Sequence, residues 1–379
     1  MTNPNQPHST ADAEASAAPV SQPTPSPFVR ILLLILITAG AAISGICPDL
    51  MSASVFAAIT AGLFSYTFLL TFSPLLFAVI PISVIAAYAA TFSFYHAFQT
   101  LLFLPLAVTI VLCMLRFRNK TQTVIRGACA IGIAILILFL ITYMMHNGTI
   151  APEALKASYN DFFEQMRTQM TDSMVGAYEA MESAAQSSND QADLSHPILG
   201  ADPAASPTDP ADAEKQKAAM EAYLRATVDL SVNSVKLAFP ALFAIGAQVL
   251  AYLALTVYRT LTRLCKTPFM LPRNYRITVS RTAAVIFVIA YLINMFPTGS
   301  STSITQIASA NLATMMMPGI FLMGLNSLAR RAKDPFRRRS FIITAVVIGF
   351  LVLVYPSYAI FFVLIDGIGE VFFGGRSIF

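Results

Sequence analysis

The sequence predicts an all-α, polytopic membrane protein with about nine transmembrane helices and an external amphipathic helical hairpin. Hydrophobic residues make up 56% of the chain and charged residues only 12%, about half of the 25% that soluble domains carry. The missing charges leave uninterrupted apolar runs at 31–47, 51–115 and 237–258. Each run is at least as long as the roughly 17 residues that a helix needs to cross a bilayer. A polar stretch at 146–233 divides the chain into two hydrophobic halves.

Nine segments have the length and composition of a transmembrane helix, five in a first half at 28–146 and four in a second half at 234–379. No charge separates the second segment from the third, which leaves eight spans as the alternative. The nine segments are 31–46, 52–72, 74–90, 94–115, 127–145, 235–258, 282–296, 304–328 and 341–364.

The N-terminal residues 1–27 are rich in Ser, Pro, Ala, Thr and Asn, and we expect them to form a disordered tail. The first apolar run contains Ala39-Gly40-Ala41, which resembles a signal-peptidase site. Only Arg30 stands where a secretory signal would have its basic region, so the sequence favours a retained first span over a cleaved signal.

Basic residues indicate the orientation in the membrane. The segments 116–126, 259–281 and 330–339 hold four, six and six of the 24 Lys and Arg residues. Cytoplasmic loops carry an excess of Lys and Arg, and nine spans with the N-terminus inside place all three segments in the cytoplasm. The sequence therefore predicts a multi-pass protein of the cell membrane, with residues 147–233 extracytoplasmic.

The polar insert at 147–233 has an amphipathic helical pattern on both sides of an expected flexible linker at 187–210. Between 146 and 232 it carries 14 acidic and five basic residues, a net charge of −9. The spacings of three and four indicate one apolar face on each helix. The first face is Leu155, Tyr159, Phe162, Met166, Met170, Met174, Tyr178 and Met181, and the second is Met220, Leu224 and Val228.

No enzymatic signature is present. P-loop, HExxH, GxSxG and paired-cysteine patterns are absent from the sequence, and the four histidines are widely dispersed. Cys47, Cys113, Cys129 and Cys265 lie in or beside apolar segments, where we interpret them as small packing residues. We expect a protein that is not an enzyme, with no catalytic residues, no metal and no cofactor.

Polar side chains at membrane depth are the candidates for a binding site. Gln248, Asn294, Gln306 and Asn311 lie within the sixth, seventh and eighth spans. These four side chains could line a substrate cavity between helices, or they could form hydrogen bonds between helices. Both interpretations remain open.

Small residues recur on the second span, at Ala53, Ala57 and Ala61. This spacing lets another helix approach closely. The neighbour is either another helix of this chain or a separate subunit.

The second half contains several short motifs, which are Pro268-Phe269-Met270-Leu271-Pro272-Arg273, Ile365-Asp366, Phe372-Phe373 and Arg376. In these motifs the chain resembles the YybS-like family of multi-spanning bacterial membrane proteins of unknown function, over roughly residues 52–379. That family is in turn similar to the substrate-binding S-components of energy-coupling-factor transporters. The resemblance implies a membrane protein that binds a small molecule, and it implies that Ala53, Ala57 and Ala61 meet a coupling subunit.

Two hypotheses for function follow. The first is S-component-like binding or transport of a small molecule of unknown identity. The alternative is a membrane scaffold whose external hairpin binds a membrane or cell-envelope protein. Both include the lipid bilayer as a partner. The basic loops have no interleaved aromatic residues, so we expect no nucleic-acid binding.

Overall fold

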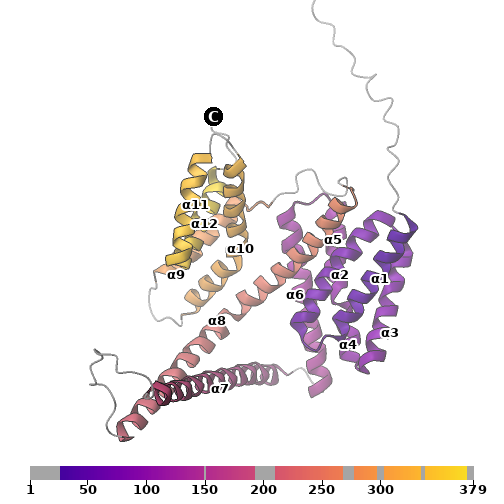
Figure 1. Cartoon of the computed structure of the whole chain (residues 1–379). Coiled ribbons are helices and arrows are strands. Elements are labelled where there is room, and N and C mark those ends of the chain that lie inside the picture. The colour runs from indigo at the N-terminus through magenta and orange to yellow at the C-terminus, as the bar shows by residue number, and fades with distance from the viewer. Residues whose placement is uncertain are drawn as a thin grey trace, which may run out of the picture.

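The computed structural model describes residues 26–148, 151–192, 210–267, 277–296, 303–333 and 338–373. These residues form helices and no strand, arranged as two membrane bundles joined by one long helix (Figure 1). Seven described helices are long and apolar enough to cross a membrane, and Arg281–Met295 and Phe341–Val354 are shorter apolar helices. The all-α, polytopic fold class is therefore confirmed. The expected disordered tail lies outside the described residues as far as residue 25.

The N-terminal bundle contains five of the candidate spans. The second and third are separate, because α2 ends where Phe72 adopts a left-handed backbone conformation (φ 44°). Buried Ile37, Phe64 and Phe103 lie at the centre of the bundle. Its helices are α1 (Pro27–Ile46), α2 (Leu50–Thr71), α3 (Val79–Thr91), α4 (Phe94–Gln99), α5 (Phe103–Leu115) and α6 (Lys120–Asn147), with short 3-10 turns at Pro74–Ala78 and Thr100–Leu102.

Helix α8 (Pro210–Leu264) connects the two bundles. Its C-terminal half packs against α2 and α6, its middle packs against α10, and its N-terminal part pairs with α7 (Pro152–Ala192) (Figure 1). The helix runs without a break from the polar insert into the sixth span. A single 55-residue helix thus forms one arm of the α7–α8 hairpin and contacts both membrane bundles.

The α7–α8 hairpin agrees with the amphipathic pattern in most positions. Met166, Met170 and Met174 pack against Val228 and Val232 of α8. Phe163 is buried at this contact, whereas Phe162 and Met181, which the pattern favoured, are 54% and 74% exposed. The expected linker also begins too early, because α7 continues to Ala192. Residues 193–209 lie outside the described residues, and α8 begins at Pro210.

The C-terminal bundle has one more helix than the sequence suggested. The expected last span at 341–364 is wrong, since the chain breaks at Tyr355. Pro356 restricts the residue before it and has no N–H to continue a helix. The two resulting helices are antiparallel neighbours (Figure 1). The bundle consists of α9 (Arg281–Met295), α10 (Ile304–Lys333), α11 (Arg338–Val354) and α12 (Pro356–Phe373).

Glycines bring α10 and α12 unusually close together. A Cβ atom on Gly324 would collide with the Val363 carbonyl, and one on Gly367 would collide with the Ile320 carbonyl. Two ion pairs hold the same helices further along, Arg330 with Glu370 and Arg331 with Asp366. Because α12 returns along the bundle, its C-terminal end lies beside the basic end of α10.

The basic segments gather at one end of the molecule. The α5–α6 turn, the end of α8, the start of α9 and the end of α10 all lie toward the top of Figure 1. Hydrogen bonds confirm one of these proximities: the Thr278 N–H donates to Thr121 Oγ1, and Asn119 Nδ2 donates to Thr278 Oγ1. The clustering agrees with the charge pattern in the sequence.

Candidate functional site

The α8–α10 contact contains a proline inside each helix, which interrupts the backbone hydrogen bonds without ending the helix. Pro240 lies inside α8 and Pro318 lies inside α10. A proline has no N–H to donate to the carbonyl four residues earlier, so each interruption frees backbone groups. In a bilayer these groups need partners from neighbouring helices.

Asn311 of α10 supplies partners for α8. Its Oδ1 accepts from the Ala241 N–H at 3.3 Å, and its Nδ2 donates to the Leu237 carbonyl at 2.9 Å. Leu237 and Ala241 are the pair whose hydrogen bond would close the helical turn around Pro240. The Asn311 carboxamide therefore ties α10 to both ends of the helical turn that contains Pro240.

Gln248 of α8 makes the converse contact with α10. Its Nε2 donates to the Met315 carbonyl at 3.1 Å, in the turn that precedes Pro318. Each helix thus contributes a carboxamide to the turn that proline weakens in the other. Gln248 and Asn311 form hydrogen bonds between helices, the second of the two interpretations that the sequence left open.

Beside this contact lies a polar recess of about 190 Å³. It is smaller than the roughly 300–1,000 Å³ of pockets for drug-sized ligands. None of the described residues that line it is charged. The lining residues are Ser234, Leu237, Ala238, Asn294, Gln306, Ile307, Ala310, Asn311 and Thr314.

Two of the lining side-chain amides, those of Asn294 and Gln306, form no hydrogen bond among the described residues. The Asn311 amide also lines the recess, but it forms a hydrogen bond to α8. Thr314 also lines the recess. Its carbonyl lacks the usual helical donor, because Pro318, four residues later, has no N–H. The recess therefore offers uncharged donors and acceptors to a small polar molecule.

The structure brings three of the four sequence candidates together. Asn294, Gln306 and Asn311 line the recess, and Gln248 lies outside its lining. Ser234 was missed, because it lies one residue before the predicted sixth span at 235–258. The prolines were the available signal, since a proline within an apolar run marks freed backbone groups.

The alanine stripe of α2 faces the protein interior. Ala53, Ala57 and Ala61 have no exposed surface, and the Ala53 carbonyl accepts a hydrogen bond from Ser44 of α1. The stripe therefore packs against helices of this chain, and the expectation of a separate coupling subunit at these residues is wrong.

The cysteines differ from one another in burial. Cys113 is buried as expected, but Cys129 and Cys265 are exposed, so the packing interpretation fails for these two. Cys129 lies on an exposed surface of α6, and Cys265 directly follows the end of α8.

Helix α7 of the hairpin is attached to α8 beside Pro240. The Tyr159 hydroxyl donates to the Lys236 carbonyl at 3.1 Å, which is the carbonyl that Pro240 leaves without a helical donor. The Lys236 ammonium donates to Asn160 Oδ1 at 2.8 Å and lies over the rings of Tyr159 and Phe163. Burial raises the pKa of the Tyr159 phenol.

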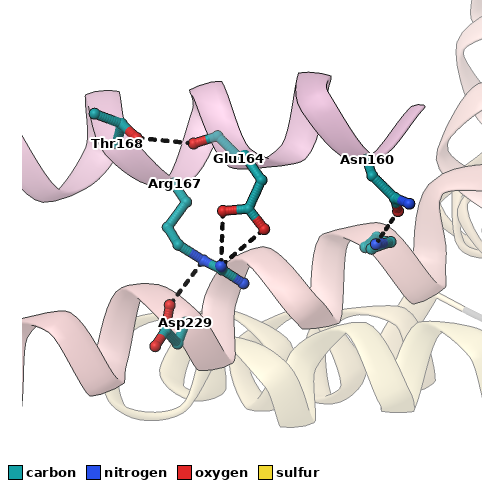
Figure 2. Close-up of polar contacts among 6 residues, drawn as sticks. Asn160, Glu164, Arg167, Thr168 and Asp229 are labelled. Atoms are coloured by element: carbon teal, nitrogen blue, oxygen red, sulfur yellow. Dashed lines mark hydrogen bonds and ion pairs between the residues drawn. The ribbon is translucent and has the colours of Figure 1, made fainter. Parts of the chain in front are cut away.

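Further along the hairpin, Arg167 of α7 reaches across to α8 (Figure 2). It forms an ion pair with Asp229 at 2.8 Å and a second one with Glu164 of its own helix. The three groups are partly exposed, so these ion pairs add little to the free energy of unfolding and mainly fix how α7 aligns with α8. Together with Tyr159 and Asn160 they give the hairpin one register on α8.

The helices and their apolar surfaces define the class of this protein, an all-α polytopic membrane protein. Comparison with known proteins does not define this class more narrowly. The chain matches no protein-family model, no curated protein and no solved structure.

Proposed function

We propose that this protein binds a small, uncharged polar molecule in the recess between α8, α9 and α10. The observation that carries the proposal is the pair of carboxamides, Asn294 and Gln306, without a described hydrogen-bond partner beside two proline-interrupted helices. The YybS-like resemblance points to the same S-component-like role.

The orientation of this site follows from the basic ends. With those ends in the cytoplasm, Asn294 at the end of α9 and Gln306 at the start of α10 lie toward the outside. The protein is then a multi-pass protein of the cell membrane that receives its ligand from the extracytoplasmic side. Reporter fusions after Asn189 and after Lys333 test this orientation. The proposal expects opposite sides, and the same side for both would overturn it.

Ligand binding is tested with the full-length protein in lipid nanodiscs. Thermal unfolding is followed with separate panels of neutral sugars, nucleosides, amides and polyols at millimolar concentration. We expect one panel to raise the unfolding temperature, and we expect Asn294→Leu and Gln306→Leu to abolish the increase. Gln122→Leu is the matched control, because Gln122 lies at the opposite end of the membrane domain on α6.

Two results would contradict the proposal. One is that no panel changes the unfolding temperature of the unmodified protein. The other is an increase that persists in Asn294→Leu and in Gln306→Leu, because such binding would lie elsewhere.

A scaffold role is the second candidate, and the exposed apolar residues of the hairpin favour it. Phe162, Tyr223 and Leu230 are all more than half exposed on helices that are otherwise polar. A photo-cross-linking residue at each position tests for a protein partner in intact cells. One discrete adduct from all three positions supports the scaffold, and adducts with lipid alone exclude it.

A further inference from the structure

A groove on the outer surface of the N-terminal bundle lies far from the polar recess. It runs between the end of α5 and the beginning of α6 and has a volume of about 320 Å³. Leu112, Ile125 and Cys129 form much of its apolar wall, and Arg116 and Arg126 lie in its lining. The groove therefore combines two positive charges with a surface suited to hydrocarbon.

The two arginines have no carboxylate partner in the described part of the chain. No ion pair of either one occurs among the described residues, and 116–126 contains no Asp or Glu. Both arginines are exposed. Arg116 caps the C-terminal end of α5, where the helix dipole favours a cation. Their charge is therefore available to an anion from outside the protein.

The surface below the groove is apolar and open. Val108 and Leu112 of α5 and Ile133 and Leu136 of α6 are exposed and continue the groove toward the middle of the membrane. Phe117, beside the arginines, is also exposed, as an aromatic ring at the membrane interface often is. Free phosphate would use only the charged end of this surface, whereas a phospholipid would use its whole length.

We propose that this groove binds one anionic phospholipid of the leaflet on the basic side of the protein. Arg116 and Arg126 hold the phosphate, and an acyl chain lies along Leu112, Ile125 and Cys129. Guanidinium groups suit this role because they form paired hydrogen bonds to phosphate oxygens. Basic pockets between transmembrane helices bind anionic head groups in this way. The site is independent of the polar recess.

Native mass spectrometry of the full-length protein tests the site by titration with phosphatidylglycerol and, separately, phosphatidylcholine. We expect one tightly held phosphatidylglycerol and no equivalent phosphatidylcholine. Arg116→Gln and Arg126→Gln should each weaken binding about five-fold, the contribution of one basic residue near an anionic surface. The matched control is Arg263→Gln with Lys266→Gln, which removes two exposed charges from the same end of the molecule.

A further variant separates a phospholipid from a free anion. Cys129→Phe fills the groove and leaves both arginines in place, so it should weaken phosphatidylglycerol binding, and inorganic phosphate should not compete. The proposal is overturned if the control variant loses as much binding as the arginine variants. It is also overturned if phosphatidylcholine binds equally, if Cys129→Phe has no effect, or if inorganic phosphate displaces the lipid.

Discussion

The Asn311 carboxamide bridges the Leu237 carbonyl and the Ala241 N–H across the interruption that Pro240 makes in α8. One side chain of α10 thereby satisfies a donor and an acceptor that belong to the same helical turn. The Tyr159 hydroxyl satisfies the Lys236 carbonyl one residue earlier. The interruption is therefore where the hairpin, α8 and the C-terminal bundle are joined.

Removal of Asn311 should destabilise the protein more than removal of Gln248. Asn311→Leu removes two hydrogen bonds between α10 and the backbone of α8, worth about 0.6 kcal/mol each in a membrane protein. Gln248→Leu removes one hydrogen bond between helices, worth about 0.6 kcal/mol in a membrane protein. Reversible unfolding in mixed micelles measures both free energies, with Gln306→Leu as control. Equal losses would contradict the bridging role of Asn311.

Tyr159→Phe should loosen the hairpin without unfolding the membrane bundles. The variant keeps the ring, which contacts Phe163 and Phe239, and removes only the hydroxyl that bonds to Lys236. We expect a loss of about 1 kcal/mol and faster hydrogen exchange in 155–170 and 228–240. Tyr223→Phe is the matched control on the exposed side of α8. Unchanged hydrogen exchange in Tyr159→Phe would contradict the claim that the Tyr159 hydroxyl holds α7 to α8.

Alkaline pH should weaken the same junction. Burial raises the pKa of Tyr159 in the folded protein above its ordinary value of about 10. The folded state then holds the phenol proton more tightly than the unfolded state. This contribution is complete below about pH 10 and is lost as the pH rises through the folded-state pKa. Hydrogen exchange of the hairpin measured at pH 8 to 11 should rise more steeply in the unmodified protein than in Tyr159→Phe. An equal rise of hydrogen exchange with pH in the two proteins would contradict this prediction.

Exchange of the charges between Arg331 and Asp366 tests the return of α12 along α10. Arg331→Asp alone should cost about 1.5–3 kcal/mol, the usual contribution of a hydrogen bond to a charged group. The double variant Arg331→Asp with Asp366→Arg should recover part of that loss. If α11 and α12 formed the single span expected from the sequence, residue 366 would lie at the opposite membrane surface and no recovery would occur.

The sequence predicts most helices correctly because hydrophobicity decides whether a segment enters a bilayer. It failed at Tyr355, where the apolar run continues through a helix break that only Pro356 signals. It also favoured Phe162 over its neighbour Phe163, because helical steps of three and four residues from Tyr159 lead to either position. Which aromatic ring is buried depends on the angle at which α7 crosses α8, and the pattern does not contain that angle.

The candidate site was predicted in part for a similar reason. Polar residues in apolar spans were recognisable, and three of the four chosen lie at one recess. The sequence could not distinguish a carboxamide that forms a hydrogen bond to another helix from one that has no such bond. That distinction depends on which helix faces Pro240 or Pro318, a long-range contact. The alanine stripe was ambiguous as well, because small residues permit close packing without specifying the neighbour.

The most direct test of this account is a double-mutant cycle between Pro240 and Asn311. Pro240→Ala restores the N–H that donates to the Lys236 carbonyl and removes the clash of the proline ring with that carbonyl, so the turn from Leu237 to Ala241 should depend less on Asn311. We predict that Asn311→Ala lowers the unfolding free energy by at least about 1 kcal/mol more in the Pro240 protein than in Pro240→Ala. Additive effects, within about 0.5 kcal/mol, would contradict the claim that Asn311 supports α8 at Pro240.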